Sequence, residues 1–362
     1  EDLMENANVT EVDFAAKAAE EIAAGRMDAV GIARQNLVDP EWVNKILEDR
    51  VEDIKPCINC HNACFSFNKS KSTPNMQPMD DSLHLARCAL TPSTMQHNKY
   101  KIVPTRKPKK VAIIGGGIGG MEAARVLKLR GHNPIIHEKS NVLGGTFIPA
   151  SAESYKGKLR DLLDWYRRQM TKLGIEVRLN DEIKDIAAFG SDPVIIATGS
   201  TPRLLRRVPG YEKMIEGCDY LNGAEVGNTV AVIGGGLTGC EIAYELALQG
   251  KNPIIVEMKD DLISQTGVCL ANSSYLREWF ALHKTPVYLE TTLKEVKDGS
   301  IVCTGKDGKD INIDCDSVIS CAGYIPAPLA EKSGNVHLVG DCLAIGNLRS
   351  VVWRAYDVAM KI

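Results

Sequence analysis

The chain has few aromatic residues, which fits α/β layers better than an all-β sandwich. It also has no long apolar run and no excess of charge of one sign, and each of these absences excludes a class of protein. No stretch approaches the roughly 20 apolar residues that a membrane-spanning helix needs. The 43 basic and 46 acidic side chains leave a net charge of -3, which provides no positive field for wrapping nucleic acid. The acidic N-terminal residues lack the apolar core of a secretory signal. We therefore expect a cytoplasmic protein with no membrane and no nucleic-acid partner.

The cysteines do not form the pattern of a secreted disulfide framework. Their number, 11, is odd, and no export signal accompanies them. Four of them crowd between residues 57 and 88, which suggests a ligand cluster. The other seven are predicted to be reduced, mostly buried thiols: Cys218, Cys240, Cys269, Cys303, Cys315, Cys321 and Cys342.

One internal repeat dominates the sequence. Residues 111–138 (VAIIGGGIGGMEAARVLKLRGHNPIIHE) return at residues 230–257 (VAVIGGGLTGCEIAYELALQGKNPIIVE) without a gap, with 17 of 28 positions identical. Each copy predicts a buried strand, a glycine turn, a helix ended by glycine, and a second strand that closes on an acid. The repeat therefore predicts two βαβ units in two domains of an α/β protein.

The glycine turn of the first copy has the spacing of a dinucleotide site. Gly115 permits the tight turn, Gly117 lets the backbone approach a pyrophosphate, and Gly120 lets the helix pack closely on the strand. Glu138 follows at the distance at which an acid binds the ribose hydroxyls.

The second copy is equally complete, with Gly234, Gly236, Gly239 and Glu257. Two such sites suggest two different dinucleotides, such as FAD and a nicotinamide. The acid at Glu257 favours NADH over NADPH, although Lys259 lies close by in the sequence.

The four clustered cysteines have the spacing Cys57-x-x-Cys60-x-x-x-Cys64, followed by Cys88. Four thiolates suit a [4Fe–4S] cluster, because soft sulfur ligands stabilise iron–sulfur units. A structural zinc site remains the rival, unligated thiols are a further alternative, and His61 could replace one thiolate.

Simpler patterns predict the remaining elements. The expected segments are helices over 13–26 and 40–49, a short buried strand over 28–33, a loop over 65–82, a solvated basic connector over 99–110, strands in 193–203 and 335–342, and a helix from Ser350.

The first repeat copy, Ala197-Thr198-Gly199 and Gly340-Asp341 together resemble the two-dinucleotide flavoprotein disulfide reductase superfamily. The resemblance implies FAD in the first Rossmann unit and a nicotinamide in an inserted second one. It places Gly340 and Asp341 at the flavin ribityl and pyrophosphate, and residues 197–199 at the junction beside the FAD. It also adds Lys139 and Gly145, which follow only the first copy's acid, to the FAD-binding residues. The redox cysteine pair of those reductases is missing here, so electrons must leave the flavin by another route.

Residues 28–64 (DAVGIARQNLVDPEWVNKILEDRVEDIKPCINCHNAC) sharpen the resemblance. They are similar to the end of the TIM barrel and the iron–sulfur loop of the 2,4-dienoyl-CoA reductase, 2-enoate reductase and trimethylamine dehydrogenase family, which is related to old yellow enzyme. In that family an arginine after the last barrel strand binds the FMN phosphate, and Arg34 fits that place. Nearly all of the barrel is absent here, so Arg34 lacks its partners, and FMN is expected only in a full-length protein.

The expected fold class is α/β, with two Rossmann-like domains of the flavoprotein disulfide reductase type behind a TIM-barrel remnant and an iron–sulfur loop. The predicted domains are a barrel remnant (1–54), an iron–sulfur segment and linker (55–106), an FAD-binding domain (107–218 plus 326–362) and an NAD(P)H-binding domain (219–325).

The resemblance implies the electron-input portion of an NADH-dependent ene-reductase, with a small-molecule substrate bound elsewhere in the full-length enzyme. Electrons would pass from NADH to FAD, to the [4Fe–4S] cluster and to FMN, which would reduce an activated C=C bond of an enoate or enoyl-CoA. No residue of this chain is expected to act as a catalytic acid or base, and a homo-oligomer is an open expectation. The alternatives are a trimethylamine-dehydrogenase-like oxidase with ADP in its nucleotide domain, and a non-catalytic nucleotide-binding module with a zinc knuckle.

Overall fold

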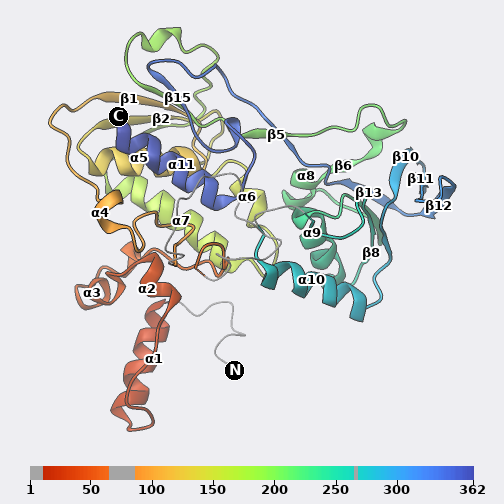
Figure 1. The fold of residues 1–362 in the computed structure, drawn as a ribbon, viewed down its shortest axis with the longest axis horizontal. Coiled ribbons are helices and arrows are strands. Elements are labelled where there is room, and N and C mark those ends of the chain that lie inside the picture. Colours follow the sequence, from red (N-terminus) through yellow and green to blue (C-terminus); the bar gives the residue numbers. More distant parts are fainter. Residues whose placement is uncertain (1–10, 65–85, 265–267) are drawn as a thin grey trace.

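The computed structural model describes residues 11–64, 86–264 and 268–362, which form two parallel-sheet units side by side and an N-terminal extension (Figure 1). The predicted loop over 65–82 lies outside the described residues. No helix in the described part of the chain is long and apolar enough to cross a bilayer.

The first unit is a five-stranded parallel sheet in the order β15-β4-β1-β2-β3. Its strands are β1 (Lys110–Ile114), β2 (Asn133–His137), β3 (Glu176–Arg178), β4 (Val194–Ile196) and β15 (Val336–Leu338). Its helices are α5 (Ile118–Leu129), α6 (Phe147–Ala150), α7 (Gly157–Lys172) and α11 (Leu348–Lys361). The buried side chains of α5, α7 and α11 form one core with β1 and β2, with Tyr166 and Trp353 among its largest members.

The second unit repeats this architecture in the order β6-β13-β7-β8-β9. Its strands are β6 (Ile215–Glu216), β7 (Thr229–Ile233), β8 (Asn252–Val256), β9 (Val287–Tyr288) and β13 (Ser317–Ser320). Its helices are α8 (Gly217–Leu221), α9 (Leu237–Leu248) and α10 (Leu270–Leu282). Equivalent residues are paired in the two copies: Val111 lies opposite Pro134, and Val230 lies opposite Pro253. The repeat seen in the sequence is thus a structural repeat.

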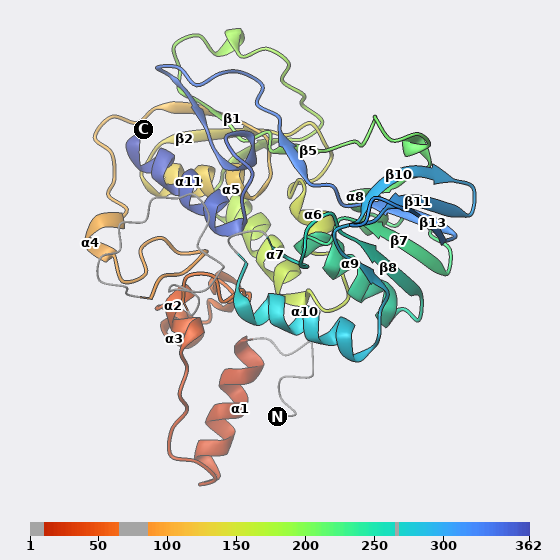
Figure 2. The ribbon, with the colours of Figure 1, turned by 45° about the vertical axis from the view of Figure 1, so that its right-hand side comes forward.

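Two smaller sheets complete these units, as Figure 2 shows from a second side. An antiparallel meander joins β9 to β13 and consists of β10 (Thr292–Lys297), β11 (Ser300–Thr304) and β12 (Asp310–Asp314). A two-stranded ribbon, β5 (Ser200–Pro202) and β14 (Tyr324–Pro326), carries the chain between the units. The second unit is therefore an insertion between β4 and β15 of the first.

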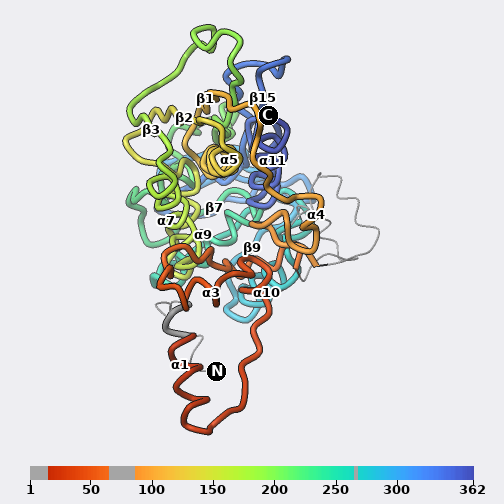
Figure 3. Tube along the Cα trace, turned by 90° about the vertical axis from the view of Figure 1, so that its left-hand side faces the viewer, coloured from red at the N-terminus to blue at the C-terminus, as the bar shows by residue number. Residues whose placement is uncertain are grey.

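The N-terminal extension contains α1 (Glu11–Ala23), α2 (Arg34–Val38) and α3 (Trp42–Leu47), and α4 (His97–Tyr100) precedes the first unit. Figure 3 shows α1 and the segment after it extending away from both sheets. Short 3-10 turns occur at Val51–Asp53, Ala187–Phe189, Tyr211–Lys213 and Gly340–Cys342.

One expected element is wrong and three helices differ in their bounds, the first of them being α1, expected over 13–26 and observed at Glu11–Ala23. Residues 28–33 form no strand, and their side chains are exposed or half-buried, because the described chain offers no neighbouring strand with which they could pair. The helix expected over 40–49 is the shorter α3. The last helix begins at Leu348, two residues before Ser350, because Asn347 and Ser350 form a capping box there.

Candidate functional site

The first glycine loop has the geometry that its spacing predicts. Gly115 has a φ of +107°, and a Cβ on it would lie 2.5 Å from the carbonyl oxygen of Ala197. A Cβ on Gly120 would lie 2.0 Å from the carbonyl oxygen of Gly115, so α5 packs too closely on the turn after β1 for any side chain. Gly117 is the N-cap of α5, and the nearest atom to its ideal Cβ is 3.9 Å away. The second glycine thus has a single ordinary contact, with Gly144, at a helix N-terminus, where phosphates bind.

The second loop repeats these contacts. Gly234 has a φ of +110°, and a Cβ on it would lie 2.5 Å from the carbonyl oxygen of Cys321. A Cβ on Gly239 would lie 1.9 Å from the carbonyl oxygen of Gly234, and Gly236 is the N-cap of α9. Both units therefore present a glycine turn and a helix N-terminus in the same arrangement.

The two acids at the ends of β2 and β8 each bind their own glycine loop. Oε2 of Glu138 accepts a 2.6 Å hydrogen bond from the amide of Gly116, and Oε2 of Glu257 accepts an equal bond from the amide of Gly235. The second oxygen accepts from the amide two residues on, that of Ser140 or Lys259, at 2.8 Å. These bonds fix each carboxylate beside its loop, where a carboxylate still has lone pairs for a ribose diol.

The other residues assigned to the first nucleotide gather around the same sheet edge. Gly145 lies against Gly117, because a Cβ on it would be 3.3 Å from the Cα of Gly117. Lys139 is exposed directly after Glu138. Residues 197–199 follow β4, and the Thr198 hydroxyl donates to the carbonyl of Ala327 at 2.6 Å, which ties the junction to the returning chain.

Gly340 and Asp341 form the turn between β15 and α11. Oδ1 of Asp341 accepts from the amide of Gly346 at 3.1 Å, and burial raises the pKa of this carboxyl. The adjacent Cys342 is buried, with its thiol against the carbonyls of Ile196 and Val339, so its contacts are those of a packed core residue.

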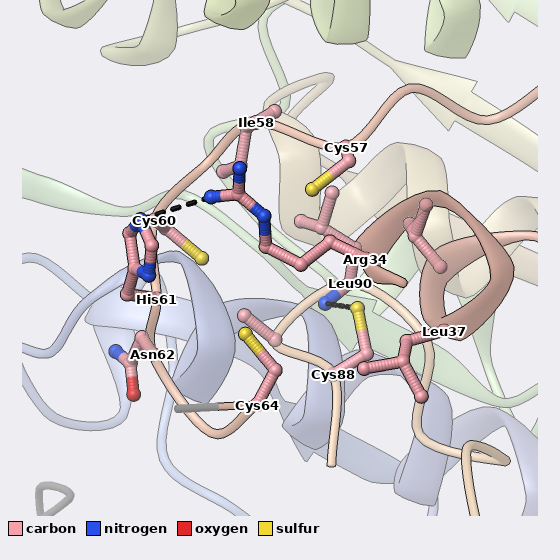
Figure 4. A pocket seen from close by; sticks show the side chains of 12 residues that line it. Arg34, Leu37, Cys57, Ile58, Cys60, His61, Asn62, Cys64, Cys88 and Leu90 are labelled. Atoms are coloured by element: carbon pink, nitrogen blue, oxygen red, sulfur yellow. Dashed lines mark hydrogen bonds between the residues drawn. The ribbon is translucent and has the colours of Figure 1, made fainter. Parts of the chain in front are cut away.

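The four clustered cysteines come together. Cys57, Cys60, Cys64 and Cys88 line one cavity, and Figure 4 shows their sulfurs directed into it from two separate stretches of chain. Leu37, Val38, Ala89 and Leu90 supply its apolar wall. Burial raises the pKa of Cys60 to about 12 and also raises that of Cys88. Ligation of a metal would therefore release protons from these thiols.

The loop between the first three cysteines has an unusual backbone. Asn59, His61 and Ala63 have φ values of +53°, +50° and +97°, so every second residue is left-handed although none is glycine. Alternating hands turn successive N–H groups to one side and make a concavity that binds anions, as in many iron–sulfur sites. The amide of Leu90 also donates to the sulfur of Cys88 at 3.4 Å. The donor set and its backbone thus fit a negatively charged group with soft sulfur ligands.

The described residues present no ready-made site for a single metal ion. One zinc at about 2.3 Å from each sulfur requires sulfurs roughly 4 Å apart. Among the residues that the structure describes, no three His, Cys, Asp or Glu side chains lie close enough together to hold one ion. Nε2 of His61 instead lies 2.9 Å from Nη1 of Arg34, which is itself part of the cavity wall.

Three residues that the sequence analysis did not single out hold the cysteine segments in place. The Gln35 side chain donates to the carbonyl of Lys55 at 3.0 Å and accepts from the amide of Cys57 at 3.1 Å. Nε1 of Trp353, on α11, donates to the carbonyl of Cys88 at 2.9 Å. The Lys55 ammonium donates to the carbonyl of Leu90. Of these three residues, only Lys55 could have been suspected from the sequence, because it stands two residues before the first cysteine.

The two nucleotide-type units, the second inserted into the first, define a protein of the two-dinucleotide flavoprotein class. The chain belongs to the pyridine nucleotide-disulphide oxidoreductase family, whose profile matches residues 109–342. This membership confirms the predicted fold class and implies flavin and pyridine nucleotide as cofactors.

Relatives confirm the narrower resemblance. The chain is 34% identical to cinnamate reductase of Clostridium sporogenes over 94% of its own length and 50% of that protein's. It is 32% identical to NADH oxidase of Thermoanaerobacter brockii over 98% of its own length and 54% of that protein's. The solved structure of 2-naphthoyl-CoA reductase with 2-naphthoyl-CoA superposes with a TM-score of 0.83 at 27% identity, covering 95% of this chain and 52% of that one. The chain thus spans about half the length of these relatives.

Proposed function

We propose that this chain is the electron-input portion of an NADH-dependent ene-reductase. In this proposal electrons pass from NADH to FAD, to a [4Fe–4S] cluster and then to FMN in the barrel of a longer protein. The names of the relatives support an enoate or an enoyl-CoA as the final acceptor. The expected cytoplasmic location and the preference for NADH over NADPH belong to this proposal.

One observation carries the proposal. Four cysteine sulfurs from two stretches of chain surround one cavity, and Trp353 of α11 holds the carbonyl of one of these cysteines. The same helix begins just after Gly340 and Asp341, the turn assigned to the flavin. Helix α11 therefore follows the proposed flavin turn in the chain and contacts the proposed cluster site through Trp353.

The bound groups would supply the electron chemistry, and the residues of this chain bind and orient them. Gly115, Gly117 and the start of α5 would hold the FAD pyrophosphate, with Glu138 on its ribose. Gly234, Gly236 and Glu257 would do the same for NADH. The four thiolates would hold the cluster, and the apolar wall of the cavity would exclude water.

Iron, sulfide and colour test the proposal. Protein purified without oxygen should be yellow-brown and contain iron and acid-labile sulfide, and NADH should bleach its flavin absorbance. Zinc in place of iron would overturn the proposal. Bound FAD that NADH does not bleach would favour the trimethylamine-dehydrogenase-like alternative, and colourless protein would favour the nucleotide-binding module.

A matched pair of cysteine variants tests the ligand assignment. The iron content of Cys88→Ser should be lower than that of the wild type by about tenfold or more. Loss of a residue that only supports a ligand typically lowers metal affinity by about tenfold, and Cys88 is itself a proposed ligand. Cys269→Ser should retain the wild-type content, because Cys269 is the N-cap of α10, where serine is a favoured residue. Equal iron in both variants would contradict the assignment of Cys88.

A further inference from the structure

A lysine is buried behind the cysteine cavity. Lys55 is only 6% exposed, and its ammonium donates to the carbonyl oxygen of Leu90. It also lies 5.0 Å from the centre of the Trp165 ring and 5.7 Å from that of Tyr166. Burial of an ammonium group raises the free energy of the folded state unless a compensating group interacts with it. The groups around Lys55 must therefore explain why it is buried.

The charge of Lys55 is not cancelled by an ion pair. The buried acid whose charge acts most on Lys55, Glu122 on α5, forms a two-pronged pair with Arg125 at 2.8 Å for each contact. Within the described residues no carboxylate oxygen lies within salt-bridge distance of the Lys55 nitrogen. Lys55, Arg125 and Glu122 together therefore carry one net positive charge. The Lys55 ammonium places this charge beside Leu90, in the wall of the cysteine cavity.

This positive charge lies next to the residue that binds the sulfur of Cys88. The carbonyl of Leu90 accepts from the Lys55 ammonium. The N–H of Leu90 donates to the same sulfur at 3.4 Å. The ammonium therefore binds the residue whose N–H donates to the sulfur, and its charge acts on that sulfur across a buried, weakly screening interior.

We propose that Lys55 is a positioning residue that raises the reduction potential of a cluster held by the four cysteines, acting through its buried charge and its contact with Leu90; this rests on the proposed function. Reduction adds one electron and one negative charge to the site, with no bond formed or broken. A buried positive charge and hydrogen bonds to the sulfur both stabilise the more negative state. Electron transfer from the flavin to the cluster becomes more favourable as a result.

The test is a reductive titration of the whole chain at one fixed pH near neutrality, followed by electron paramagnetic resonance. A chemical reductant of known potential supplies one electron per cluster. Lys55→Met, which keeps the length of the side chain without its charge, should lower the equilibrium constant for reduction about tenfold, or 59 mV for one electron. Lys55→Arg restores the charge and should return the potential most of the way to that of the wild type.

The control is Lys309→Met, which removes an exposed lysine of the second unit. It should leave the potential unchanged. If Lys55→Met keeps the cluster and has the reduction potential of the wild type, the proposed role of Lys55 is overturned and the proposed function is not. Loss of the cluster from both Lys55→Met and Lys55→Arg would also overturn it, since that outcome shows a purely structural role. A wild-type chain that holds no iron would instead overturn the proposed function, and this inference with it.

Discussion

At the scale of single residues, the third glycine of each loop is the position least open to change. A Cβ on Gly120 or Gly239 would lie 2.0 Å or 1.9 Å from a carbonyl oxygen of its own loop. Neither oxygen belongs to a flexible side chain, so the backbone itself must move. Because the two loops are built alike, substitutions at these positions can separate the functions of the two units.

Gly120→Ala should abolish FAD retention, and Gly239→Ala should keep the FAD but weaken NADH binding. Each clash displaces a helix N-terminus and should also lower the free energy of unfolding by about 2 kcal/mol. The flavin absorbance of purified protein and a calorimetric titration with NADH measure the two effects. The matched control is Gly334→Ala, whose Cβ would meet no atom within 4 Å. Loss of FAD from Gly239→Ala would show that the assignment of the two loops is wrong.

At the scale of elements, α11 organises the first unit. It packs along α5, its Trp353 holds the carbonyl of Cys88, and its first turn is fixed by Asn347. The Asn347 side chain accepts from the amide of Ser350 at 3.2 Å, and the Ser350 hydroxyl accepts from the amide of Asn347 at 3.0 Å. This capping box sets where the helix begins after the Gly340–Asp341 turn.

Asn347→Ala should lower the free energy of unfolding by about 1 kcal/mol, because it removes the acceptor for the amide of Ser350. Urea denaturation followed by circular dichroism measures the change. Asn347→Asp keeps an oxygen acceptor at the cap and should remain within a few tenths of a kcal/mol of the wild type. Equal losses in both variants would show that the cap does not carry this effect.

The sequence was sufficient wherever the pattern was local. The strands and helices of both βαβ units follow from the two repeat copies, and the spacing of residues 57–64 marked the cysteine site. It was insufficient where partners are distant in the chain. Lys55 meets Leu90 and Trp165 only after folding, and residues 28–33 read as a strand because their composition does not reveal that pairing partners are missing.

At the scale of the whole molecule, a polar clamp joins the two units. The Lys156 ammonium of the first unit lies 3.1 Å from Glu153 and 2.9 Å from Glu241 on α9 of the second. The Ser154 hydroxyl donates to Glu245, also on α9, at 2.8 Å. One ammonium thus faces two carboxylates at the interface, and Glu153 is the more deeply buried of the two.

This clamp predicts a pH dependence of stability. Burial, and then the charge of Glu241, raises the pKa of Glu153 above 4.5 although Lys156 opposes the shift. The folded state therefore binds this proton more tightly than the unfolded state, so the stabilising contribution is present below the unfolded-state pKa and is lost as the pH rises through the folded-state pKa.

Glu153→Gln removes this titration. As the pH rises from about 4 towards neutrality, the wild type loses this stabilising contribution and the variant does not. The free energy of unfolding of the variant should therefore rise relative to that of the wild type. Thermal unfolding at a series of pH values measures the difference. Glu278→Gln, at an exposed position on α10, is the control and should follow the wild type throughout. A constant difference between Glu153→Gln and the wild type at every pH would contradict the prediction.

The insertion of one unit within the other also dictates an order of events during synthesis on the ribosome. The inserted sheet has all its strands once Ser320 has been translated, whereas the outer sheet waits for Val336–Leu338 to pair with β4, and then for α11 to cover α5. Until then β4 presents an unpaired edge, which other chains can join. The nascent polypeptide therefore completes its inner unit first, and the outer unit closes only after α11 has been translated.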